Sequence, residues 1–210
     1  MSKAALKDQE GLDSDKFKKG TPAKLVKAAE QLFWYQGHKA TSIDEIVQKT
    51  KQSKGAFFHY FSSKNDVTKV VIERYAREEI AGPLEKYFAQ TSDIKEALLI
   101  WAQDVFTQAM NRRFKGGCML GNMALELSDQ DDEIRQQLAH VFLDWENQLS
   151  NFFREEGRRG SLLMEPRQFA RVVIATLEGF LMSAKVHKDK RRAAREFQAL
   201  AELFERLIRD

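Results

Sequence analysis

The chain has 210 residues, of which 43% are hydrophobic and 31% charged, with three prolines and one cysteine. One cysteine excludes an intrachain disulfide framework and a metal site built from several cysteines, and no run approaches the roughly 18 apolar residues of a membrane-spanning helix. Alternating β-branched runs are absent, which predicts an all-α protein. Residues 1–18 are polar and lack the apolar stretch of a secretory signal, so we predict a flexible N-terminal arm and a cytoplasmic protein.

The charge is distributed unevenly along the chain. The formal net charge is only +3, yet residues 16–69 carry eleven lysines against four acidic residues, a net of +7. A local excess of this kind favours a polyanion partner for one end of the molecule. On charge alone, a solvated basic face without a partner is an equally good interpretation.

The first two predicted helices have clear start and stop signals. Pro22 follows Thr21 at the start of the first helix, and Gly37 ends it. The second helix follows Ser42, and Glu45 lies three residues further on, which is the spacing of a capping box.

A third, very short helix is predicted over residues 54–61, with Ser53 as its cap. Together with the helix over residues 43–50 it has the spacing of a helix-turn-helix, whose second helix lies in the DNA major groove. Phe57 and Phe61 are four residues apart, share a helix face and are expected to pack inward. Residues 57–61 form a cluster of five consecutive aromatic rings, in which Phe58 and His59 then point outward and Tyr60 lies to the side.

Several other residues of this segment suit DNA. Gly55 lets the backbone approach the duplex closely, and Lys54 can donate hydrogen bonds to a guanine edge or to a phosphate. Phe58 and His59 point away from the core. Hydroxyl, amide or ammonium donors for phosphate oxygens are present at Thr41, Ser42, Tyr60 and Lys64.

The stretch "AAEQLFWYQGHKATSIDEIVQKTKQSKGAFFHYFSSK" resembles the DNA-binding domain of the TetR/AcrR family of transcriptional regulators. The match covers about residues 20–66 and runs through Ala29, Phe33, Gly37, Thr41, Ile46, Ser53, Lys54, Gly55, Phe57, Tyr60, Phe61 and Lys64. The resemblance implies DNA contacts from the recognition helix at Gln52, Lys54, Gly55, Phe58, His59 and Tyr60, and phosphate contacts at Thr41 and Lys64. It also implies a homodimer, a palindromic operator and a ligand-responsive C-terminal domain of about six helices.

One departure from the family pattern lies in the turn, where "TKQ" replaces the usual Ala-Gly-Val. Lys51 stands where a glycine suits the left-handed residue that ends the helix, at a cost of about 1 kcal/mol. Gln52 replaces an apolar packing residue. Both side chains can add DNA contacts, or the turn is simply a tolerated weaker one.

The pattern predicts about nine helices and a division into residues 19–66 for DNA binding and residues 67–210 for effector binding and dimerisation. A long helix from Lys64 is expected to end or kink near Gly82 and Pro83. Asp189 is expected to cap the last helix. The other long helices are predicted over residues 93–112, 131–157 and 166–187.

The C-terminal half has enough bulky, polarisable side chains to line an effector pocket, although such residues also form plain core. The predicted pocket or sensor residues are Trp101, Phe106, Cys118, Met119, Asn122, Met123, Trp145 and Phe180. "GGCMLGNMALELSD" is similar to a subgroup of the family in which some members sense electrophiles or oxidants through the cysteine and others bind small organic acids. A helix N-terminus and basic neighbours would lower the pKa of Cys118, whereas inert packing is the alternative.

The last two long helices have wide apolar faces, which favour a four-helix interface with a two-fold mate. The predicted interface residues are Val173, Leu177, Phe180, Phe197, Leu200 and Phe204. We predict no cofactor and no metal.

These features favour a ligand-responsive, DNA-binding regulator and predict a repressor, released from its operator by a small molecule or by modification of Cys118. The scattered histidines and the lack of a catalytic motif argue against an enzyme. A helical interaction protein without DNA binding is the alternative.

Overall fold

The computed structural model describes residue 17, residues 19–159 and residues 162–209. Within these ranges the chain is all-α, as predicted, and contains no strand. The predicted arm lies outside the described residues except for Phe17, whose ring stacks on that of Phe61 at 5.4 Å. None of the described helices combines the length and the hydropathy that a membrane crossing requires.

The chain forms two compact units, which divide between Arg74 and Tyr75. The first unit contains α1 (Gly20–Gln36), α2 (Ile43–Thr50), α3 (Lys54–Tyr60) and all but the last residue of α4 (Lys64–Tyr75). The predicted helices over residues 43–50 and 54–61 are confirmed to within one residue at either end, whereas the first helix begins at Gly20, two residues before Pro22, with Lys19 and not Thr21 as its N-cap. Helix α1 packs against both α2 and α3. The core of this unit contains the fully buried side chains of Leu25, Phe33, Ile46, Phe57, Val67 and Val71.

Polar contacts tie α4 to the rest of the first unit. The His38 ring shares a hydrogen bond between Nε2 and the Thr68 hydroxyl at 3.0 Å, in the interior of the unit. Near the end of α4, Arg74 forms an ion pair with Glu30 of α1. Because Glu30 and Thr68 are both buried, these contacts satisfy polar groups that would otherwise be costly to bury.

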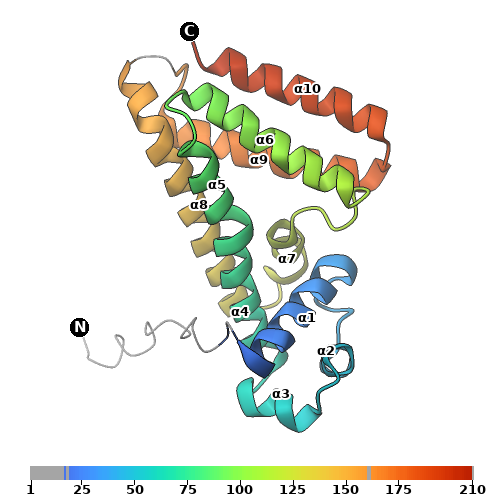
Figure 1. Cartoon of the computed structure of the whole chain (residues 1–210). Coiled ribbons are helices and arrows are strands. Elements are labelled where there is room, and N and C mark those ends of the chain that lie inside the picture. Colours follow the sequence, from blue (N-terminus) through green and yellow to red (C-terminus); the bar gives the residue numbers. More distant parts are fainter. Residues whose placement is uncertain (1–16, 18, 160–161, 210) are drawn as a thin grey trace, which may run out of the picture. The chain divides into compact units, whose positions relative to one another are not determined.

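The second unit is a layered bundle of longer helices. Its elements are η1 (Ala76–Ala81), α5 (Gly82–Phe88), α6 (Ile94–Asn111), α7 (Met119–Leu127), α8 (Asp132–Arg159), α9 (Pro166–His187) and α10 (Lys190–Leu207). Figure 1 shows α10 beside α6 and α9, and α8 packs along α9. Asp189 caps α10 as predicted, accepting a hydrogen bond from the Arg192 amide at 2.9 Å.

The helix from Lys64 does not end at Gly82 and Pro83, which was one of the two predicted outcomes, and an irregular segment directly precedes them. The backbone remains helical through Gly82, with φ −60° and ψ −49°, and residues Ala76–Ala81 instead form a π-helical segment in which the Gly82 amide donates to Arg77 O. A proline inside an α-helix clashes with the carbonyl four residues earlier. The wider π turn relieves that crowding without ending the helix. When α4, η1 and α5 are counted as one continuous helix, the described residues contain nine helices.

Candidate DNA-binding surface and ligand cavity

Serine side chains cap the starts of α2 and α3, and a short turn joins the two helices. The Ser42 hydroxyl accepts from the Glu45 amide at 3.2 Å, and the Glu45 carboxylate accepts from the Ser42 amide at 2.7 Å, which confirms the capping box. That amide is the main cause that lowers the pKa of Glu45. At the start of α3 the Ser53 hydroxyl accepts from the Ala56 amide at 3.1 Å. Lys51 adopts the left-handed conformation, with φ 55° and ψ 36°, as predicted for this position.

The aromatic cluster divides between the core and the surface as predicted. Phe57 and Phe61 are buried, with their ring centroids 5.4 Å apart. Phe58 is 52% exposed, and His59 is exposed beside the half-buried Tyr60. The outward face of α3 therefore presents aromatic side chains that the unit itself does not cover.

The N-terminal end of α3 is open and positively charged. Lys54 and Gly55 are exposed, as is Lys51 in the turn, and Gln52 is half-buried. The Lys54 ammonium lies 2.8 Å from the Asp44 carboxylate, and both side chains are more than half exposed. An ion pair this exposed contributes little to stability, so Lys54 can exchange Asp44 for a phosphate or a base edge at small cost.

The environments of Thr41 and Lys64 require a correction. The Thr41 hydroxyl is buried and donates to Gly37 O at 2.7 Å, and the Thr41 amide donates to His38 O at 3.1 Å. Both of its donors are thus used inside the unit. The Lys64 ammonium donates to His38 O and Thr41 O, both at 2.9 Å. These residues hold the loop between α1 and α2 in place, and two of the three ammonium hydrogens of Lys64 already have acceptors.

The second unit contains a partly enclosed cavity of about 60 Å³. Three of the predicted pocket residues, Trp101, Cys118 and Trp145, line it. The other lining residues are Tyr75, Glu79, Ile80, Pro83, Val105, Leu177, Leu181, Gly117, Asp104, Gln108, Arg112 and Glu178. The π segment η1 thus forms part of its wall, and π segments occur often at functional sites.

The remaining predicted pocket residues lie elsewhere and are corrected here. Phe106 and Phe180 are buried in an aromatic cluster, and Met119 and Met123 are buried core residues of α7. Asn122 is half-buried and accepts from Lys185 Nζ at 2.9 Å while it donates to a backbone carbonyl. These side chains are used for packing and internal hydrogen bonds.

Cys118 is the N-cap of α7, as predicted, but its pKa is raised rather than lowered. Burial of the thiol is the main cause, and the neighbouring carboxyl of Glu178 adds to it. Burial also raises the pKa of Glu178, which is hydrogen-bonded to the thiol. Amide donors at the helix start act in the opposite direction and are outweighed. The structure therefore favours a thiol, and not a thiolate, at this position.

Twelve of the lining residues were not predicted as part of the pocket, and Glu178 is the one among them that contacts the Cys118 thiol. It is the sole charged residue between Arg171 and Lys185, and a lone acid in an apolar helical run is the signal that could have found it. Gly121 on α7 leaves room for it, since a Cβ there would lie 2.3 Å from Glu178 Oε2.

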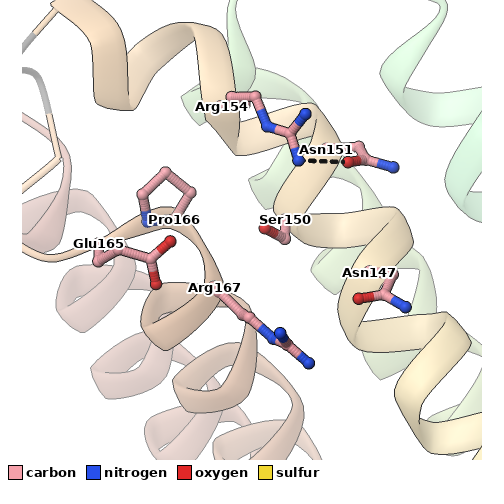
Figure 2. A pocket seen from close by; sticks show the side chains of 7 residues that line it. All are labelled: Asn147, Ser150, Asn151, Arg154, Glu165, Pro166 and Arg167. Atoms are coloured by element: carbon pink, nitrogen blue, oxygen red, sulfur yellow. Dashed lines mark hydrogen bonds between the residues drawn. The ribbon is translucent and has the colours of Figure 1, made fainter.

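A second hollow is larger, about 630 Å³, and open to solvent. Figure 2 shows its polar lining from α8 and the start of α9, which consists of Asn147, Ser150, Asn151, Arg154, Glu165, Pro166 and Arg167. Arg154 donates to Asn151 at 3.0 Å, and Arg167 pairs with Glu146. The arginines thus already have partners. Among the described residues no group of three or more histidine, cysteine or acidic side chains is placed to hold a metal ion.

The predicted dimer interface also requires a correction. The single chain already buries five of the six residues, Val173, Leu177, Phe180, Leu200 and Phe204, and Phe197 is half-buried. A partner could reach them only if the helices of one chain separated. The apolar side chains that remain exposed on α9 are Met182, at 60%, and Val186, at 70%.

Sequence comparisons identify the family of both units. Residues 25–71 match the family described as bacterial regulatory proteins, tetR family, and residues 96–200 match the tetracyclin repressor-like C-terminal domain. The chain belongs to the TetR family. It is a transcriptional regulator with a DNA-binding helix-turn-helix domain.

The TetR-family relatives span nearly the same length as this chain. An uncharacterised HTH-type transcriptional regulator in the lacX 3' region of Lactococcus lactis is 28% identical over 90% of this chain and 95% of the relative. The Escherichia coli K12 repressor NemR is 24% identical over 79% of this chain and 84% of its own. The repressor DhaR from Mycobacterium sp. GP1 is also 24% identical, over 79% of this chain and 83% of DhaR.

Solved TetR-family structures share the fold. The regulatory protein TetR from Rhodobacter sphaeroides superposes with a TM-score of 0.78 at 24% identity, over 89% of this chain and 97% of that one. The reduced form of E. coli NemR gives a TM-score of 0.77 at 22% identity, over 89% of this chain and 96% of the NemR chain.

Proposed function

We propose that this regulator is a repressor that binds a palindromic operator as a homodimer and is released by a small molecule bound in the second unit. The observation that carries the DNA-binding part is the outward face of α3, where Phe58, His59, Lys54 and Gly55 are exposed while Phe57 is buried. Recognition helices of helix-turn-helix proteins present such a face to the major groove.

The DNA-contacting residues in this proposal differ in role. Base and backbone contacts are assigned to Ser42, Lys51, Gln52, Lys54, Gly55, Phe58, His59 and Tyr60. Thr41 and Lys64 are assigned a positioning role, because their donors hold the loop before α2.

Dimerisation is proposed to use the outer surface of α9 and α10. Ala175, Gly179, Met182 and Val186 follow the helical period along one side of α9, and a Cβ built at Gly179 meets nothing within 4 Å. Leu203 of α10 is also exposed. Small and apolar residues in this pattern let helices from two protomers approach closely and bury the exposed methionine and valine.

The proposed switch links the cavity to the DNA-binding unit through the chain itself. Tyr75, Glu79, Ile80 and Pro83 line the cavity, and they lie in or next to the π segment that continues α4. A ligand that favours one conformation of this segment would change the spacing of the two DNA-binding units in a dimer. Only a difference in ligand affinity between the two conformations can shift that equilibrium.

A matched pair of variants tests DNA binding. Gly55→Glu adds a negative charge to the proposed groove-facing end of α3, where an added Cβ meets only Ser53 Oγ at 3.7 Å, so the fold tolerates it. Gln31→Glu adds the same charge at an exposed position of α1. In gel shifts with the DNA upstream of the protein's own gene, we expect Gly55→Glu to abolish binding and Gln31→Glu to retain it. Binding by Gly55→Glu as tight as that by Gln31→Glu would refute α3 as the recognition helix, and absence of binding by the unsubstituted protein would support the alternative of an interaction protein without DNA binding.

A further inference from the structure

The buried polar atoms without a hydrogen-bond partner among the described residues include Trp145 Nε1 and Glu178 Oε1, and both residues line the cavity. Trp145 is only 6% exposed, and an indole N–H can only donate. A buried polar atom without a partner is costly, and in a native protein it calls for an explanation. A bound molecule that satisfies both atoms supplies one.

Several other polar side chains of the cavity wall have hydrogen-bond partners within the second unit. Gln108 donates to Asp104 at 2.6 Å, and Arg112 donates to Gln108 at 3.4 Å, so these three residues form a chain along one side of α6. The Tyr75 hydroxyl is hydrogen-bonded to the backbone of Met119. Trp145 Nε1 and Glu178 Oε1 are the atoms that a bound molecule would satisfy in this proposal.

The size and charge of the cavity limit what it can hold. About 60 Å³ is enough for two waters or for an organic molecule of about four heavy atoms. Glu79 is exposed, so solvent screens its charge, and the half-buried Asp104 and Arg112 carry opposite charges. Burial raises the pKa of Glu178 and so favours its neutral form, so the cavity has no net charge that favours an anion or a cation.

We propose that this cavity takes a small uncharged molecule that presents a carbonyl or hydroxyl oxygen to Trp145 Nε1 and an N–H or O–H group to Glu178 Oε1. Primary amides and small hydroxylated carbonyl compounds have this chemistry. The proposal rests on the proposed function, in which the cavity is the effector site.

Acetamide and acetate form a matched pair of probes, because each has four heavy atoms and they differ in charge. Fluorescence is measured in a Trp34→Phe variant, in which the remaining tryptophans, Trp101 and Trp145, both line the cavity. Acetamide is expected to give a saturable change, and acetate to bind at least about tenfold more weakly. An added Trp145→Phe change, with Trp101 as the reporter, is expected to weaken acetamide binding about tenfold.

Two results would overturn this ligand class. One is saturable binding of acetate with an affinity equal to that of acetamide, and the other is no saturable signal with either probe. Unchanged acetamide affinity in the Trp145→Phe variant, with native circular dichroism, would overturn the assigned contact.

Operator affinity, measured separately by fluorescence anisotropy, keeps the two proposals apart. If acetamide binds but does not alter DNA affinity, the ligand class stands and the proposed switch fails. If another compound releases the DNA while acetamide does not bind, the switch stands and the ligand class fails.

Discussion

Lys64→Met tests the positioning role assigned to Lys64. The substitution keeps the apolar stem of the side chain and removes an ammonium that donates to His38 O and Thr41 O, both at 2.9 Å. A hydrogen bond from a charged donor contributes about 1.5–3 kcal/mol. Lys64 is half-buried, so solvent reduces this to about 1 kcal/mol for each bond. We therefore expect the free energy of unfolding to fall by about 2 kcal/mol.

The matched control is Lys49→Met on α2. Lys49 is exposed, so its replacement changes the net charge by the same amount without removing contacts to the loop. Urea denaturation followed by circular dichroism gives the stability of each variant, and binding to DNA of random sequence at several salt concentrations gives the electrostatic contribution. In each variant, the slope of the logarithm of the binding constant against the logarithm of the salt concentration is expected to decrease by at most the amount that corresponds to one phosphate contact.

The two variants should differ in stability and in operator binding. Lys64→Met displaces the loop that presents α2, so it should weaken operator binding more than Lys49→Met does. If both variants have the same unfolding free energy, the two carbonyl contacts do not hold the loop. The positioning role would then be refuted.

Four further predictions concern Lys51, Cys118, Met182 and Glu178. Lys51→Gly relieves the left-handed conformation and should raise the unfolding free energy by about 1 kcal/mol, while it lowers DNA affinity in gel shifts if Lys51 contacts phosphate. Cys118, buried and with a raised pKa, should react with iodoacetamide at least about tenfold more slowly in folded than in denatured protein; equal rates would favour the sensor. Met182→Glu should convert dimers to monomers in analytical ultracentrifugation, whereas Leu125→Glu, at an exposed position of α7, should not. Because burial raises the pKa of Glu178, the native state binds this proton more tightly than the unfolded chain does. Unfolding free energy should therefore fall as the pH rises above the ordinary value of 4.5, and Glu178→Gln should remove that fall.

The helix-turn-helix was predictable because its signals are local. Ser42 and Glu45 form the predicted capping box, and Ser53 caps α3. The four-residue spacing of Phe57 and Phe61 correctly predicted that both are buried. Each of these features depends on residues within about one helical turn. Sequence patterns specify such short-range geometry well.

The proposed dimer surface was not predictable in the same way. Val173, Leu177 and Phe180 repeat at the helical period, and this pattern is the same whether a helix packs within its own chain or against a partner. The choice depends on where α6, α8 and α10 lie around α9, which is tertiary information. Met182 and Val186 remain exposed on the side that those helices leave uncovered.

The prediction for Cys118 shows how two correct local features gave a wrong result. The cysteine does precede a helix, and basic residues do lie nearby in the sequence, but neither feature reveals burial or the carboxyl of Glu178 sixty residues away. In a low-dielectric site the desolvation of a thiolate outweighs the favourable amide donors. A helix N-terminus lowers the pKa of a cysteine only where solvent or a counter-charge also reaches it.

Glu178 also explains why a glycine is suited to position 121. Any other residue would place a Cβ 2.3 Å from Glu178 Oε2, closer than non-bonded atoms approach, so the carboxyl group would have to move. Gly121 thus permits Glu178 to lie beside Cys118, where burial favours its protonated form. A small residue on α7 and a lone acid on α9 are unremarkable when each is considered within its own helix. Their functional meaning arises only when the fold brings the two helices together around the cavity.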